Sequence, residues 1–161
     1  MAKNKTVVTN AMRILKASKV DFRVVEYETD EVGEAFGEKI AELTGISPDI
    51  SFKTLVARGD RSGVMVACIP VNCEVDLKKL AKASGNKKVE LIHVKDLLSL
   101  TGYIRGGVSP VGMKKQYPTY VEAMAMEFAE IAISGGRCGT TLMLSPRDLE
   151  KVTNCEFCDL V

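Results

Sequence analysis

The sequence predicts an α+β domain with a mixed, barrel-like β-sheet, and three observations lead to this prediction. Helical and strand-like apolar patterns alternate along the chain, without internal repeats or low-complexity linkers. Two apolar runs, 52–58 and 64–70, are separated by a cluster of turn formers, which is typical of an antiparallel hairpin. Several other strand-like runs are joined through helical segments, so hairpins and helices both connect the strands.

The N-terminal third is expected to contain two helices around one strand. Residues 6–18 have helical periodicity, and the apolar side chains on one stripe are Val7, Val8, Ala11, Ile14 and Leu15. Residues 22–27 follow as a strand. The apolar spacing in 36–44 predicts a short helix, and Gly45 is its expected C-cap.

The rest of the chain continues the alternation after the hairpin. Asp76 begins an amphipathic helix, because an acidic residue is favourable at a helix N-terminus. Four further elements are expected: strands at 89–92, 130–134 and 140–144 and a helix at 95–100. Ser145 and Pro146 begin the last helix as N-cap and first-turn proline, and a final strand is expected at 157–161.

Length, charge and cysteine content restrict the class of protein. A chain of 161 residues with 46% hydrophobic residues fits one domain, residues 1–161. Acidic residues gather in 21–50 and basic residues in 78–115, which predicts either a basic face for a polyanion or solvated helix faces. The start lacks a signal peptide and no apolar run is long enough for a membrane span, so a cytoplasmic protein without a membrane partner is expected.

The five cysteines do not indicate a disulfide framework or a metal site. Their number is odd, which argues against a secreted disulfide scaffold. Residues 155–158 form a single CxxC motif with no second pair and no nearby histidine. A redox or zinc role is the alternative, but a structural zinc site needs four ligands and the chain offers no matching set.

Lys53 is the main candidate functional residue because it is the only charge in an otherwise apolar strand, 51–57. Charged groups are rarely buried without a partner or a task. Two later loops, 106–112 and 134–137, are rich in glycine and can bring bare backbone amides to a ligand. Together they predict a site for an anionic or ester-bearing ligand. The alternative is that Lys53 extends into water and the loops are ordinary turns.

Six short motifs occur in order along nearly the whole chain. They are Phe36-Gly37, Phe52-Lys53-Thr54, Asp76-Leu77-Lys78-Lys79, Thr101-Gly102-Tyr103, Gly106-Gly107-Val108-Ser109-Pro110-Val111-Gly112 and Ile133-Ser134-Gly135-Gly136. In this order they resemble the YbaK/EbsC family, relatives of the editing domain inserted in bacterial prolyl-tRNA synthetases. The resemblance implies a barrel-like mixed sheet surrounded by helices, without a metal or another cofactor. It also implies a trans-acting hydrolase for Cys-tRNA(Pro) and Cys-tRNA(Cys), with aminoacyl-tRNA and prolyl-tRNA synthetase as partners.

The resemblance and the residue chemistry together define a candidate site. Lys53 and Gly106 are the candidate catalytic residues: Lys53 would hold the phosphate of the terminal adenosine or the ester carbonyl, and Gly106 would donate a backbone amide to developing charge. The hydroxyls of Thr54 and Ser134 are expected to bind the amino group or the ribose. The candidate substrate-binding residues are Tyr27, Phe36, Thr54, Gly107, Ser109, Ser134, Gly135 and Gly136. For Tyr27 and Phe36 the alternative is core packing.

The sequence argues against a nucleophile supplied by the protein. His93 is the single histidine, and no serine or cysteine elbow accompanies it, so a structural role is favoured over that of a general base. The resemblance implies instead that the cysteinyl thiol of the substrate attacks its own ester carbonyl. An aminoacyl ester already has a good leaving group, so the protein mainly has to position it and stabilise the oxyanion.

Two positions depart from the family pattern and leave the substrate open. Ala35 stands where close relatives have asparagine, and Thr141 stands where they have aspartate. A deacylase for Ala-tRNA(Pro) or another small aminoacyl-tRNA is therefore the first alternative. The second is a module that binds a nucleotide or a synthetase without turnover.

Overall fold

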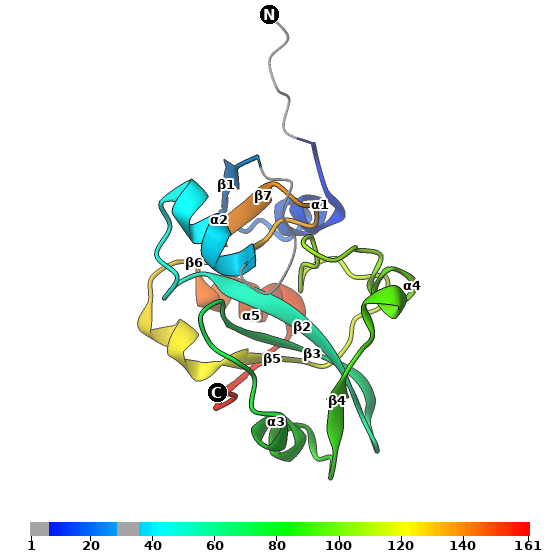
Figure 1. Cartoon of the computed structure of the whole chain (residues 1–161). Helices are drawn as coiled ribbons and strands as arrows, with labels where there is room; N and C mark the ends of the chain where they lie inside the picture. Colours follow the sequence, from blue (N-terminus) through cyan, green and yellow to red (C-terminus); the bar gives the residue numbers. More distant parts are fainter. Residues whose placement is uncertain (1–6, 29–35) are drawn as a thin grey trace, which may run out of the picture.

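The computed structural model describes residues 7–28 and 36–161, whose strands form two β-sheets (Figure 1). The smaller sheet is antiparallel, in the order β1 (Arg23–Glu26), β7 (Thr140–Leu144) and β6 (Ile131–Ser134). The larger sheet has five strands in the order β4-β2-β3-β5-β8. Their bounds are Val89–Leu91 for β4, Phe52–Gly59 for β2, Gly63–Pro70 for β3, Thr119–Glu122 for β5 and Glu156–Cys158 for β8.

The predicted α+β class and the mixed pairing are confirmed. β2 pairs antiparallel with β3 and β4, whereas β3–β5 and β5–β8 are parallel. The two sheets meet where the chain enters β2, because the Ala132 amide donates to the Ile50 carbonyl at 2.8 Å and Ser51 forms a parallel bridge with Ala132. β4 and β8 end the larger sheet and β1 ends the smaller one, so the described strands do not close into a barrel.

The helices begin and end at residues with the expected capping chemistry. Their bounds are Asn10–Ala17 for α1, Phe36–Thr44 for α2, Leu77–Ser84 for α3, Leu97–Thr101 for α4 and Pro146–Thr153 for α5, with 3-10 turns at Val94–Asp96 (η1) and Ala123–Glu127 (η2). The Asp76 carboxylate accepts from two amides in the first turn of α3, and the Ser145 hydroxyl accepts from Asp148 in α5. Gly45 follows α2 with a positive φ of 74°, as predicted for its C-cap.

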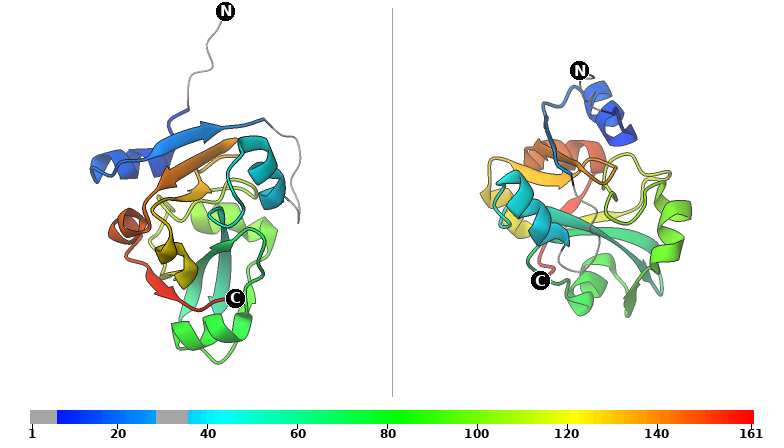
Figure 2. Two further views of the ribbon diagram at one scale, coloured as in Figure 1. Left: turned by 90° about the vertical axis from the view of Figure 1, so that its left-hand side faces the viewer. Right: turned by 45° about the horizontal axis from the view of Figure 1, so that its top comes forward.

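Two main layers of apolar side chains hold the sheets and helices together. The first lies between the sheets, α1 and α5, and includes Leu15, Phe52 and Leu142. The second lies under the five-stranded sheet, where α3 covers the lower face as drawn in Figures 1 and 2. A smaller cluster joins Val56 of β2 to Val108 of the first glycine loop and to Tyr103, which precedes that loop. This third cluster fixes that loop above β2.

Several predicted boundaries differ from the structure. α1 begins at Asn10 because the Thr9 hydroxyl caps the Met12 amide, so Val7 and Val8 lie before the helix and are half exposed. The predicted strand at 157–161 is wrong after Cys158, since the main chain of Leu160 bonds to the side chain of Glu122 and to the amide of Asp76. β5 has no counterpart among the predicted strands. It is short, and two of its four side chains, Thr119 and Glu122, are buried although they are polar or charged.

We expect Glu122→Ala to destabilise the fold by about 3 kcal/mol, because each backbone donor to a charged group contributes roughly 1.5–3 kcal/mol. Glu122 is only 3% exposed, and its carboxylate accepts from the amides of Met124 at 2.8 Å and Leu160 at 2.9 Å. Urea unfolding of Glu122→Ala and of the exposed control Glu127→Ala measures the difference. Equal midpoints and slopes for both variants would show that the carboxylate does not fasten the C-terminal segment.

Candidate functional site

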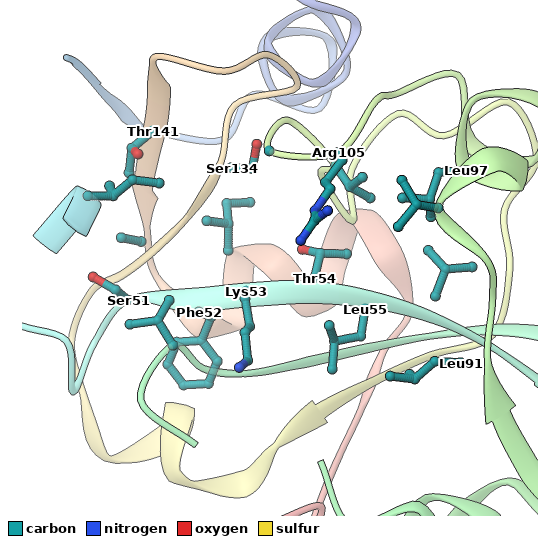
Figure 3. A pocket seen from close by; sticks show the side chains of 18 of the residues that line it. Ser51, Phe52, Lys53, Thr54, Leu55, Leu91, Leu97, Arg105, Ser134 and Thr141 are labelled. Atoms are coloured by element: carbon teal, nitrogen blue, oxygen red, sulfur yellow. The ribbon is translucent and has the colours of Figure 1, made fainter. Parts of the chain in front are cut away.

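A cavity of about 470 Å³ lies at an open edge of β2, next to α2, the β4–α4 segment and the loop 104–112 (Figure 3). Its volume falls in the range of small-molecule sites. β4 pairs only with Ala57–Gly59 of β2, and among the described residues β6 pairs with this part of the chain only through Ser51. The part of β2 between these contacts has a strand neighbour on one side alone, so the cavity occupies the space that a further strand would fill.

The open edge of β2 presents main-chain groups to the cavity. The Val56 carbonyl accepts from the Ile92 amide at 2.9 Å, on the side away from β3. Because hydrogen-bonding direction alternates along an antiparallel strand, the main-chain groups of Thr54 and Phe52 face the same side as those of Val56. Thr54 pairs with Cys68 of β3, and no described strand pairs with it on the other side. The edge can therefore donate to and accept from a ligand.

Lys53 and Arg105 are the two charged residues among the described residues that line the cavity. Lys53 is half-buried in β2, and Arg105 is exposed in the first glycine loop. Figure 3 shows the Lys53 side chain leaving β2 on the side opposite to Thr54, while the Arg105 guanidinium extends toward Thr54 from the loop. Neither cation has an ion pair with a carboxylate among the described side chains, those of residues 7–28 and 39–161. The lining is thus cationic at two points.

Hydroxyl groups and one phenol supply the remaining polar lining. Thr54, Ser134 and Tyr27 all line the cavity, so these three predicted residues lie together with Lys53 and Gly106. The Ser134 hydroxyl accepts from the Gly136 amide at 3.3 Å. Burial raises the pKa of Tyr27 above its ordinary value. The hydrogen bonds with Gly139 and Thr141 lower the pKa by a smaller amount, so the phenol is neutral at physiological pH.

The other predicted residues lie behind the cavity wall. The amide of Gly107 donates to the Ile104 carbonyl at 2.9 Å, and that of Gly135 donates to Thr140 at 2.8 Å. Ser109 is fully buried, and its hydroxyl accepts from the Val111 amide at 3.2 Å. These groups are used inside the chain, and none of the three residues lines the cavity.

The glycines of the two loops are explained by close packing of the loops against each other and against Tyr103. A Cβ on Gly107 would lie 2.7 Å from Cα of Arg137, a main-chain atom of the second loop. Gly136 has a φ of 97°, and a Cβ there would lie 2.9 Å from the Tyr103 ring. The Tyr103 hydroxyl donates to the Val111 carbonyl at 2.7 Å, which holds the first loop at both ends. Tyr103 is therefore a support for both loops.

Gly106 is the one glycine of the two loops that lines the cavity. Its φ of 88° lies in the region that residues with a side chain rarely adopt. Its amide has no hydrogen bond with the described residues, in contrast to those of Gly107 and Gly135. Gly106 can therefore present a backbone donor to a ligand. The side chain of Phe36, where α2 begins, lies outside the described residues.

Sequence reasoning missed Arg105 and the apolar part of the lining. Arg105 was counted only within the basic stretch 78–115, although its neighbour Gly106 marked the loop as a candidate site. Apolar side chains from four elements and their ends contribute to the wall: Ile40 and Ile46 from α2 and its C-terminal turn, Leu91 and Ile92 from β4 and its end, Val94 from η1 and Leu97 from α4. Thr141, which sequence reasoning noted only as a departure from the family, also lines the cavity.

The described lining contains no histidine, cysteine or carboxylate. His93 is exposed and lies outside the lining. Cys68 is fully buried behind β2, and this burial raises the pKa of its thiol to about 12. No group of three or more histidine, cysteine or carboxylate side chains in the described residues is arranged to hold a metal ion. The side chains present can orient and polarise a ligand.

The fold and the cavity place two cations and several hydroxyl groups beside an apolar wall, an arrangement that suits a ligand with an anionic or ester group beside an apolar group. A profile of the family described as "Aminoacyl-tRNA editing domain" matches residues 31–152. The chain belongs to the aminoacyl-tRNA editing domain family, and the resemblance inferred from the motifs is confirmed.

A relative in Enterococcus faecalis is 48% identical over 161 residues, which cover 99% of this chain and 98% of the relative. That relative is provisionally named Cys-tRNA(Pro)/Cys-tRNA(Cys) deacylase EbsC. Two crystal structures have the same fold. Hypothetical protein APE2540 has a TM-score of 0.83 at 24% identity, with 94% of this chain and 99% of that chain covered. A structure provisionally described as a trans-editing enzyme for prolyl tRNA synthetase has a TM-score of 0.80 at 23% identity, with 96% and 98% covered.

Among the described residues, no helix combines the length and the apolar character needed to span a membrane.

Proposed function

We propose that residues 1–161 act as one editing domain that hydrolyses the aminoacyl ester of Cys-tRNA(Pro), and of Cys-tRNA(Cys), after release from the synthetase. The main support is a cavity with two cations and an open backbone edge, whose described lining has no histidine, cysteine or carboxylate to activate a nucleophile of the protein. The high identity to the Enterococcus faecalis relative along both full lengths favours this substrate class. A prolyl-tRNA synthetase is the partner expected to supply the mischarged tRNA, and the cytoplasm is the expected place of the reaction.

The proposed reaction uses the thiol of the substrate. The cysteinyl sulfur attacks its own ester carbonyl, and an S–C bond forms as the thiol proton leaves. The bond between the carbonyl carbon and the ribose oxygen then breaks, the ribose oxygen takes a proton, and the four-membered thiolactone is released. Water hydrolyses the thiolactone to free cysteine.

The protein residues have three tasks in this scheme. Lys53 and the Gly106 amide donate to the carbonyl oxygen as negative charge develops on it. The open main chain of Thr54 and the hydroxyl of Ser134 bind the amino group and the ribose. The apolar side chains of the wall exclude water from the ester while the sulfur approaches.

The activity is tested by mixing purified protein with Cys-tRNA(Pro), Ala-tRNA(Pro) and correctly charged Pro-tRNA(Pro), and following release of free amino acid. Protein-dependent release from Cys-tRNA(Pro) is expected, with little from the other two. Release from Ala-tRNA(Pro) alone would identify a deacylase for a small apolar amino acid, for which the apolar wall and Thr141 are the relevant features. If the protein retards tRNA on a gel and leaves all three esters intact, it is a binding module.

The proposed chemistry predicts that Ser-tRNA(Pro) reacts at least about a hundredfold more slowly than Cys-tRNA(Pro). A cysteine thiol has a pKa of about 8.5 and is a few per cent thiolate at neutral pH, whereas a serine hydroxyl is far less nucleophilic. Initial rates on the two tRNAs, with trapping of the thiolactone, measure the difference. A variant in which all five cysteines of the chain are replaced by serine or alanine serves as control and should retain the activity. Similar rates for the two tRNAs would exclude attack by the substrate thiol.

A further inference from the structure

The two cations of the cavity differ in position and in exposure. Lys53 extends from the N-terminal end of β2 and is half-buried. Arg105 lies in the loop immediately before Gly106 and is exposed, with its guanidinium directed over β2 in Figure 3. The Lys53 side chain leaves β2 on the side opposite to Thr54, whereas the Arg105 guanidinium extends toward Thr54, so the two cations reach the cavity from different directions (Figure 3). The two positions suit two different groups of one ligand.

The contacts of Arg105 leave its guanidinium available. Arg23 and Arg147 have carboxylate partners, at 2.7 Å from Glu130 and 3.0 Å from Glu150. Arg105 has no hydrogen bond or ion pair with the described residues, and no described carboxylate lines the cavity that it faces. Five N–H donors in a planar fork are thus directed at a space into which the described part of the chain places no carboxylate. Such a fork matches the geometry of a phosphate better than that of a single carbonyl oxygen.

We propose that Arg105 binds the 5′-phosphate of the terminal adenosine of the aminoacyl-tRNA, and that Lys53 is thereby reserved for the ester. This inference rests on the proposed function, because it takes an aminoacylated 3′ nucleotide as the ligand. It divides between two residues the phosphate and ester contacts that the sequence analysis assigned to Lys53 alone. A nucleotide bound in this way has its charged group near solvent and its ester beside β2. The exposed apolar side chains of Leu91 and Val94 then lie at the rim, where a base can pack on them.

Two stable analogues separate the phosphate contact from the ester contact. The first is 3′-deoxy-3′-(cysteinylamino)adenosine, in which an amide replaces the ester, and the second is the same compound with a 5′-phosphate. Binding of both is measured by calorimetry or by NMR titration to wild type, Arg105→Gln, Lys53→Ala and Arg61→Gln. Arg61 is the control because it is exposed in the β2–β3 turn and does not line the cavity. Circular dichroism and the melting temperature establish that each variant is folded.

The 5′-phosphate is expected to raise the affinity of wild type and of Arg61→Gln about tenfold, because it forms a charge-assisted contact with Arg105 in both proteins. Arg105→Gln should bind the two analogues equally, whereas Lys53→Ala should keep the gain. The inference is overturned if Arg105→Gln keeps the gain, or if wild type has none, including the case in which it binds neither analogue.

The deacylation assay distinguishes this inference from the proposed function. An Arg105-dependent gain without hydrolysis of any ester supports the phosphate site and overturns the proposed activity. Hydrolysis of Cys-tRNA(Pro) without that gain supports the proposed activity and overturns the phosphate site.

Discussion

Lys53→Ala is expected to lower the rate of Cys-tRNA(Pro) deacylation by at least about a hundredfold, with the loss mainly in kcat. Lys53 is half-buried, lines the cavity and has no ion pair with the described residues, so its charge is available to the reacting carbonyl. Removing one donor from a developing oxyanion costs on the order of 3 kcal/mol, or about two powers of ten in rate. Single-turnover kinetics with saturating protein measure the chemical step.

Two variants act as controls for Lys53→Ala. Lys78→Ala removes an exposed lysine of α3 that does not line the cavity, and it should leave the single-turnover rate unchanged. Lys53→Gln keeps most of the side-chain volume without the charge and should be about as slow as Lys53→Ala. A folded Lys53→Ala protein with the wild-type rate would show that the ammonium extends into solvent and takes no part in the reaction.

Gly107→Ala is expected to reduce both stability and activity, although Gly107 does not line the cavity. The new methyl group would lie 2.7 Å from Cα and 2.9 Å from the carbonyl carbon of Arg137, so the two loops must move apart. Overpacking of this kind typically costs 1–3 kcal/mol, and a shift of about 1 Å in the loop that carries Gly106 can reduce the rate about a hundredfold. The melting temperature and kcat/KM are measured together.

Gly63→Ala is the matched control for this prediction. Its φ is 78° but a Cβ there meets no atom within 4 Å, so the variant should lose only the roughly 1 kcal/mol of an unfavourable backbone conformation and keep full activity. Full activity of Gly107→Ala would contradict the view that loop packing positions Gly106.

The parts of the fold that sequence predicted well depend on local interactions. The hairpin of β2 and β3 follows from two apolar runs around a turn, and the caps at Asp76 and Ser145 bond within one turn of helix. β5 depends instead on partners far along the chain, because it pairs with both β3 and β8. A four-residue segment that contains the buried Glu122 has no local pattern that marks it as a strand.

The candidate site was predictable to the extent that residue type identifies a role. Lys53 was predicted as a site residue because it is a charge in an apolar strand, and the structure places it in the cavity with Thr54 and Gly106. Gly107 and Gly136 were assigned to the ligand because glycine permits a close approach, but the groups that approach them belong to Arg137 and Tyr103. Sequence cannot distinguish these causes, since both require the absence of a side chain. The direction in which the Arg105 side chain points likewise depends on the conformation of its loop, which the residue type does not reveal.

The open edge of β2 also bears on how this protein avoids self-association. An unpaired strand edge is a template for another chain, and natural proteins protect such edges by covering them or by placing lysine on them. Here the open stretch is short, because β4 takes up Ala57–Gly59 and β6 meets the chain at Ser51. Lys53 stands in the middle of that stretch, inside a cavity rather than on an outer rim. The residue proposed for the reaction thus also discourages a foreign strand from adding to the sheet, so neutral replacements at this position raise the risk of aggregation as well as removing activity.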